Sequence, residues 1–269
     1  MKKIFLYLAL LTLTSCSWPE IGYRYADWLI KKRIIKVVKF YSPQIKTLEG
    51  EIDQYMQWHQ KVMIPRYEEE LLRAKKLVQK ELTSEVILEQ MERSRQLFKE
   101  TTLPLSKRVS PLLAELIEEQ IERTNTLLLR KIDENKDRLE WDRQRLKEET
   151  LKKWQDNTID WLGSLNDKQE EIIAQGIDSV LYSPKAAYAR AIEGHKAFMN
   201  TFDEPLKNRE AAFNRFFESR YKNDDFKKWR EEASALISKI MSVATPKQRE
   251  HLLKKIDYWL GVLRDIKAI

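Results

Sequence analysis

Cysteine and glycine are scarce in this chain, and its histidines are isolated. Cys16 is the only cysteine among 269 residues, so an internal disulfide is excluded. Glycine occurs 6 times, where average usage of about 7% predicts roughly 19, and no glycine-rich phosphate loop or Gly-x-Ser-x-Gly motif is present. His59, His195 and His251 lie far apart, with no metal-ligand spacing around them. We therefore expect no metal, no cofactor and no enzymatic activity.

Charged, helix-forming residues dominate the chain instead. Asp, Glu, Lys and Arg make up 34% of it, which is a helical composition, and no stretch alternates apolar and polar residues long enough to predict a sheet. The formal charge is +7, but acidic residues interleave with the basic ones, so no nucleic-acid partner is predicted. The expected fold is all-α: an elongated multi-helix bundle of about eight to nine helices, in a single domain over residues 23–269.

The amino-terminal segment has the layout of a secretory signal. Lys2 and Lys3 precede an apolar run over residues 4–13, which leads through small residues to Cys16. That run is about half of the roughly 20 residues that a membrane-spanning helix needs. Leu13-Thr14-Ser15-Cys16 resembles the lipobox of bacterial lipoproteins, in which the cysteine is acylated and the chain is cut before it. The alternative is an ordinary secreted protein whose signal happens to contain a cysteine.

The lipobox resemblance implies a location and a domain organisation. Residues 1–15 would be a cleaved lipoprotein signal peptide, cut between Ser15 and Cys16, and residues 16–22 would be the lipidated cysteine with a short tether. Ser17, rather than Asp, follows the cysteine, which by resemblance to enterobacterial sorting implies transfer to the outer membrane. The expected location is the cell envelope, anchored by palmitate-type acyl chains to the outer membrane and facing the periplasm.

The first helix, expected from about Tyr23 to Tyr41, is basic and amphipathic. One interpretation lays it on anionic lipid headgroups, because it begins a few residues from the proposed anchor. The other interpretation packs its apolar side into the protein core, as most amphipathic helices do. The basic residues that would contact a membrane are Lys31, Lys32, Arg33, Lys36 and Lys39.

Cap residues and prolines divide the rest of the chain. Ser42, Thr83 or Ser84, Asn166 and Thr245 are the expected N-caps of helices, with glutamine at or near capping-box spacing after several of them. These recurring starts indicate shared cap chemistry, since no fixed period connects them. Gly163 is an expected helix stop and Ser183-Pro184 an expected break. Asn223-Asp224-Asp225 is expected to cap a helix over residues 223–243.

Three prolines predict further features of the helices. Pro65 should kink the second helix near Lys61, and Pro104 should end the third helix close after Thr101. Ser110-Pro111 should open one long helix over residues 110–162. Its charged stretch, residues 133–149, fits either a solvated helix or a break.

The best polar constellation surrounds Pro65. Trp58, His59, Arg66 and Tyr67 could line a pocket for an anion at a kinked helix. The simpler interpretation places Trp58 and His59 in an apolar stripe and Arg66 on the surface. The tryptophans at helical core spacing are read as packing residues; they are Trp28, Trp154, Trp161, Trp229 and Trp259.

Several short motifs occur in an order that resembles a known family. They are Ala26-Asp27-Trp28-Leu29, Trp58-His59-Gln60, Ile64-Pro65-Arg66-Tyr67, Glu122-Arg123-Thr124-Asn125, Asp160-Trp161-Leu162-Gly163 and Asn166-Asp167-Lys168-Gln169. Together they resemble a domain-of-unknown-function family of helical lipoproteins from Gram-negative bacteria, which has no established activity. The chain departs from the family pattern at Gln60 and at Met63-Ile64.

Three functions remain open at this point. The first is a non-enzymatic, lipid-anchored periplasmic protein that binds another envelope component, with a protein as the expected partner. The second is a holdase-type chaperone that uses apolar and basic helix faces. The third is an enzyme acting around His59 and Arg66.

Overall fold

The protein is all-α, as predicted. Its computed structural model describes residues 22–134, 136–222 and 225–268, and these ranges contain α-helices and short 3-10 or π turns but no strand. Cys16 and the other residues of the proposed signal and lipobox lie outside them. The α-helices are α3 (Ala26–Val37), α4 (Ser42–Trp58), α5 (Ile64–Val78), α6 (Ser84–Ala114), α7 (Glu118–Asp133), α8 (Arg143–Leu162), α9 (Asp167–Gly176), α10 (Pro184–Met199), α11 (Leu206–Ser219), α12 (Lys227–Ser242) and α13 (Pro246–Ala268).

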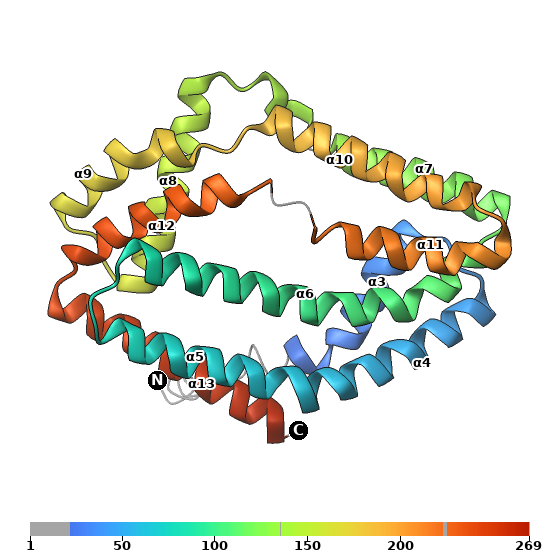
Figure 1. Ribbon diagram of the computed structural model, residues 1–269, viewed down its shortest axis with the longest axis horizontal. Helices are drawn as coiled ribbons and strands as arrows, with labels where there is room; N and C mark the ends of the chain where they lie inside the picture. The colour runs from blue at the N-terminus through green and yellow to red at the C-terminus, as the bar shows by residue number, and fades with distance from the viewer. Residues whose placement is uncertain (1–21, 135, 223–224, 269) are drawn as a thin grey trace, which may run out of the picture.

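The helices build an elongated body around α6 (Figure 1). Helices α4 and α5 follow each other along one long side, joined by the π turn η1 (His59–Met63), and α6 runs back beside them. Helices α11 and α12 pack on α6, while α13 packs on α5. Of the described helices, none is both long and apolar enough to cross a bilayer.

Two small clusters of buried side chains lie where α13 packs on α5, and the two larger clusters of the hydrophobic core lie at opposite ends of the body. One cluster joins α3, α4 and α11 to the end of α6, around residues such as Leu48 and Phe213. The other joins α8, α9 and α12 around Ile173 and Leu236. Because α6 and the α5–α13 pair run between the clusters, these helices set the distance between the two cores.

The predicted long helix over residues 110–162 is wrong. Helix α6 runs through both Pro104 and Pro111 and ends at Ala114; α7 follows, and the 3-10 turn η2 (Lys136–Glu140) separates it from α8. Thr101 and Thr102 also fail to end a helix. Like Ser110, they turn their hydroxyls back to the carbonyl four residues earlier, so none of them serves as an N-cap. The charged stretch takes the second of its two predicted forms, a break.

Helix α3 is shorter than the predicted Tyr23–Tyr41 helix. The backbone becomes extended at Val38, whose side chain and that of Phe40 are buried in the first core cluster. Burying these two apolar side chains outweighs continuing the helix, because each fully buried large side chain contributes about 1.5–3 kcal/mol.

Several cap predictions are confirmed, and two are wrong. Thr83 and the pairs formed by Asn166 and Thr245 with their glutamines cap helices as expected, and Gly163 ends α8 with a φ of 79°. The break predicted at Ser183-Pro184 is the start of α10, where Ser183 is the N-cap. Ser42 is already inside α4, because the backbone N–H of Tyr41 donates to Gln44 one residue earlier than expected. Helix α12 has Phe226 as its N-cap, so Asp225 does not cap it; Asn223 and Asp224 lie outside the described residues.

Three of the five core-spaced tryptophans are exposed. Trp154 and Trp229 pack against the second core cluster, as predicted. Trp28, Trp161 and Trp259 are instead exposed on the surface. Helical spacing places a residue on a face of its helix, but whether a neighbour covers that face is decided by tertiary packing.

Candidate functional site

The predicted polar constellation lies at the π turn between α4 and α5. Pro65 has no backbone N–H, so the carbonyl of Lys61 would lose its partner in a regular helix. The chain accommodates this by widening to a π turn, in which the N–H of Ile64 donates to the carbonyl of His59 five residues earlier. The predicted irregularity near Lys61 is thus a π turn, which begins at His59 and ends at Met63.

His59 is enclosed by tyrosines that donate to it and accept from it. Its Nδ1 lies 3.1 Å from the hydroxyl of Tyr23, and its Nε2 lies 3.3 Å from the hydroxyl of Tyr67. Tyr67 continues the chain with a short hydrogen bond to the hydroxyl of Thr101, and the Thr101 carbonyl accepts from Tyr55 at 3.0 Å. The ring of Trp58 packs edge-on against the imidazole.

The hydrogen-bond chain fixes the tautomer of His59. The Thr101 hydroxyl donates its one proton to the carbonyl of Leu97 at 2.8 Å, so it must accept from Tyr67. Tyr67 has then used its own proton and can only accept from Nε2–H of His59. Nδ1 is therefore the acceptor for the hydroxyl of Tyr23, and His59 is neutral with its proton on Nε2.

Burial supports this neutral state. It lowers the pKa of His59 to about 4, because desolvation disfavours the imidazolium. Burial, together with the proximity of Tyr67, raises the pKa of both Tyr23 and Tyr55 to about 12. A general base needs a free nitrogen within reach of its substrate, whereas both nitrogens of His59 are engaged with tyrosines.

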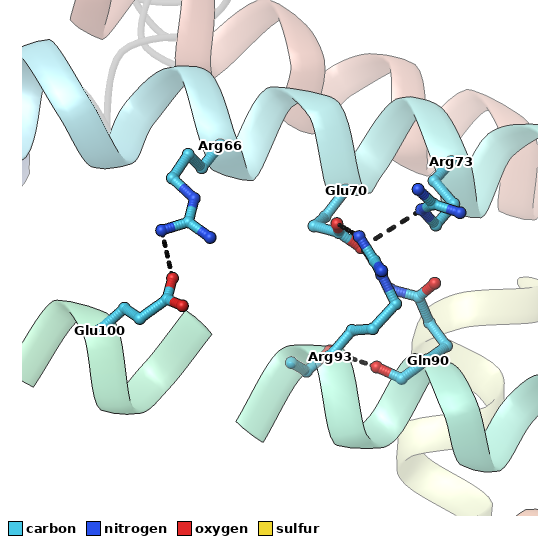
Figure 2. A network of polar contacts seen from close by, with 7 residues as sticks. Arg66, Glu70, Arg73, Gln90, Arg93 and Glu100 are labelled. Carbon is cyan, nitrogen blue, oxygen red and sulfur yellow. Dashed lines mark hydrogen bonds and ion pairs between the residues drawn. The ribbon is translucent and has the colours of Figure 1, made fainter. Parts of the chain in front are cut away.

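Arg66 does not join His59. It forms an ion pair with Glu100 across the α5–α6 interface, as Figure 2 shows. The structure thus brings together Trp58, His59 and Tyr67, and it turns Arg66 toward a carboxylate that neutralises it. Within the described residues, no group of three or more His, Cys, Asp or Glu side chains is placed to hold a metal ion.

Sequence reasoning missed three members of the cluster. Tyr55 precedes His59 by four residues, so helical spacing places them on one face and offered a usable signal. Tyr23 and Thr101 are 36 and 34 residues away from the ring partners that they contact, His59 and Tyr67. Only the folding of α6 back along α5, and the return of the amino-terminal segment to the π turn, brings them there.

A groove between α5, α6 and α12 is the second candidate site. It has a volume of about 580 Å³, and its lining is mostly aliphatic and aromatic. The side chains that form it include Leu77, Val86, Met91, Phe226 and Trp229. Trp229 is held in place by its indole N–H, which donates to the carbonyl of Val180 at 3.1 Å.

One polar group on the groove wall lacks a partner. The Gln90 amide nitrogen donates to Glu70 at 3.2 Å, while its buried Oε1 accepts no hydrogen bond from any residue that the structure describes. Figure 2 shows that Glu70 also faces Arg93 of α6 and Arg73 of its own helix. The hydrogen bond from Arg93 is the main cause that lowers the pKa of Glu70. This carboxylate therefore holds the Gln90 amide in one orientation.

Comparisons with known proteins identify a family of unknown function. No curated protein and no solved structure matches the chain. A family model described as "Family of unknown function (DUF6279)" matches residues 36–233, which is more than half of the 269 residues. The resemblance to an uncharacterised family is thereby confirmed, and the chain belongs to the DUF6279 family of unknown function.

Proposed function

We propose that this protein is a lipid-anchored, non-enzymatic component of the cell envelope that binds a protein partner in the groove between α5, α6 and α12. The anchor rests on Leu13-Thr14-Ser15-Cys16 and on the charged and apolar residues before it. Binding rests on one observation: an open, largely apolar groove, lined in part by Gln90, whose buried Oε1 accepts no hydrogen bond from the described residues. The His59 cluster supports a structural role instead, because both nitrogens of His59 and the hydroxyls of its tyrosines and of Thr101 have internal partners.

The groove offers an occupant a substantial hydrophobic gain. Each Leu-, Ile- or Phe-sized side chain that it covers contributes about 1.5–3 kcal/mol. Aromatic walls such as Trp229 and Phe226 are typical of binding hot spots, where a few large side chains carry most of the affinity. At one end, Arg230 donates to Glu92 at 2.5 Å and Arg95 donates to the carbonyl of Tyr221 at 3.1 Å, so this rim is ordered before binding.

Gln90 favours a protein segment over a free acyl chain. Covering a buried carbonyl oxygen with hydrocarbon leaves it unsatisfied, at a cost of about 1–3 kcal/mol. In the free protein this oxygen is already covered, so a peptide N–H or a side-chain donor would reach it once the Gln90 side chain rotates toward the groove, and it would then gain a hydrogen bond. We therefore expect a segment that presents bulky apolar side chains together with at least one N–H or O–H donor.

Photo-cross-linking in living cells tests the groove. A photoreactive amino acid replaces Met91 on the groove wall, and the matched control replaces Leu206, an exposed apolar residue at the start of α11. We expect one defined protein adduct at Met91 and none at Leu206, and we expect Gln90→Leu to reduce the yield at Met91 without lowering the melting temperature.

Other adducts would contradict the proposal in recognisable ways. Lipid adducts at Met91 would identify an acyl-chain site. A broad set of unrelated proteins, combined with protection of unfolded clients from aggregation, would favour a holdase-type chaperone. Equal adducts at both positions would show that the groove is not the binding site.

The anchor has a separate test. Labelled palmitate should be incorporated into the wild-type protein and not into Cys16→Ser, and envelope fractionation should place the wild-type protein with the outer membrane. Palmitate that persists on Cys16→Ser would overturn the anchor. The cross-linking experiment at Met91 tests the groove independently of this result.

A further inference from the structure

Helix α3 has two faces of different character. Its inner face packs Ile30, Ile34 and Val37 against the first core cluster, so the core interpretation of this helix holds for that side. Its other face carries large apolar and aromatic side chains that are more than a third exposed in the described structure. Tyr25 is 60% exposed, Trp28 47%, Leu29 43% and Ile35 37%.

The exposed face is also basic. Lys32 and Lys36 are exposed, and at helical spacing they lie between these aromatic and aliphatic side chains. The ammonium of Lys32 stands 4.6 Å from the centre of the Trp28 ring. Arg24 and Arg33 flank the face and are exposed as well. We call Tyr25, Trp28, Leu29, Lys32, Ile35 and Lys36 the α3 outer face.

Not all of the basic residues predicted to contact a membrane belong to this face. Lys31 donates to Glu49 of α4 at 2.6 Å, and Lys39 pairs with Glu119 of α7 at 3.8 Å. Both therefore turn toward the body of the protein. Near Lys36, the acidic neighbour is Glu134, which forms its own ion pair with Lys131.

We propose that the α3 outer face lies on an anionic lipid surface and fixes the orientation of the protein on the membrane. Trp and Tyr rings favour the headgroup region, where their apolar bodies and polar edges are both satisfied. Lysines among them are attracted to anionic headgroups. An apolar and basic helix face of this kind is typical of helices that lie in the membrane interface.

The chain length before α3 makes this contact available. This proposal rests on the proposed function in one respect: the lipid anchor at Cys16 would supply the bilayer that the outer face contacts. Tyr25 follows Cys16 by nine residues, and nine residues span at most about 30 Å when fully extended. The outer face thus stays within reach of the membrane whenever the anchor is inserted.

An environment-sensitive fluorophore on the outer face tests the contact. The acylated full-length protein is reconstituted into vesicles of phosphatidylcholine, with or without phosphatidylglycerol, and carries one added cysteine. Leu29→Cys places the label on the outer face, and Leu206→Cys places it on an exposed apolar position of α11. Brominated lipids report contact with the acyl region by quenching.

In phosphatidylglycerol vesicles we expect the Leu29 label to shift to shorter wavelength and to be quenched, while the Leu206 label stays in water. Lys32→Gln and Lys36→Gln should each weaken the anionic-lipid dependence by roughly fivefold. Equal behaviour of the two labels in both vesicle types would overturn the proposal. A shift without vesicles that grows with protein concentration would assign the face to a second copy of the chain and would also overturn it.

The same experiment separates this proposal from the anchor. Cys16 reacts with the label only if it is not acylated, so labelling of the protein without an added cysteine reports failure of the anchor. A blocked Cys16 with a Leu29 label in water would leave the anchor standing and remove the membrane contact.

Discussion

His59 shows how one side chain can resemble a catalytic residue and be fully committed to structure. It sits at an interrupted helix, beside tyrosines and seven residues before Arg66 in the sequence, a pattern that suggests a general base. The direction of each hydrogen bond decides the matter: Tyr23 donates to Nδ1, and Nε2–H donates to Tyr67. No nitrogen is left to accept a proton from a substrate while this network is intact.

Acid should weaken the protein through His59. An unfolded histidine has a pKa near 6.5, and burial lowers the folded pKa to about 4, so between these values the unfolded chain binds more protons. The free energy of unfolding should therefore fall as the pH is lowered from about 6.5 toward 4. Protonation of Nδ1 would also remove the acceptor that Tyr23 uses.

Replacing His59 by glutamine should remove this part of the pH dependence. Glutamine offers one donor and one acceptor to the tyrosines but does not titrate. In urea unfolding series from pH 7.5 to 4.5, the stability difference between wild type and His59→Gln should shrink toward acid pH. His195→Gln is the control, because burial also lowers the pKa of His195 but that side chain is less enclosed. Identical pH profiles for the two variants would contradict the assignment.

At the scale of the helix, the sequence predicted where helices begin at cap residues better than it predicted whether a helix continues past a proline. Caps depend on local chemistry, so Thr83, Asn166 and Thr245 could be recognised without knowing the fold. The helix end predicted at Pro104 and the helix start predicted at Pro111 are wrong. A proline removes one backbone hydrogen bond of its helix, and packing of α4, α11 and α12 along α6 keeps the helix together.

Gly163 gives the element-scale prediction. Its φ of 79° is a left-handed conformation, and a β-carbon there would stand 2.8 Å from Nδ1 of His251. Gly163→Ala should lower the free energy of unfolding by about 1–3 kcal/mol, from backbone strain and the collision with the imidazole together. In a His251→Ala background the steric part should disappear and the strain should remain.

Gly50 is the matched control for the same substitution. It lies in the interior of α4 on the exposed side, and a β-carbon there meets nothing within 4 Å. Gly50→Ala should stabilise the protein by about 0.5–1 kcal/mol, because alanine costs less backbone entropy than glycine in a helix. Chemical unfolding at pH 7 measures both changes, and a loss of stability at both positions would refute the conformational argument.

At the scale of the whole molecule, composition and periodicity were sufficient for an elongated all-α fold, but not for how its parts meet. No local pattern indicates that the two larger core clusters lie at opposite ends of the body, or that Tyr23 and Thr101 converge on the π turn. The groove was equally unpredictable, because its walls come from the consecutive helices α5 and α6 and from α12, which begins more than a hundred residues after α6 ends. The recurring glutamines at helix starts could be predicted in part: the sequence shows their spacing, but it does not show that they contact one another.

These glutamines join helix starts in pairs. Gln169 and Gln248 are both buried; each accepts from the N-cap amide of its own helix, and each donates its side-chain amide to the other. The amide of Gln120 likewise donates to Gln44 at 2.7 Å. One pair secures α9 and α13 at the second core cluster, and the other secures α4 and α7 at the first.

A double-mutant cycle on Gln169 and Gln248 measures this coupling between distant segments. Each single change to leucine removes the hydrogen bonds between the two glutamines and leaves the N-cap amide of its own helix without its side-chain acceptor, so each should cost about 1–3 kcal/mol. The double variant should be more stable than the sum of the single losses predicts, by about 0.5–3 kcal/mol, since its leucines share one apolar environment. Additive losses would mean that the two helix starts are stabilised independently, and the contact between them would then contribute nothing to joining α9 and α13.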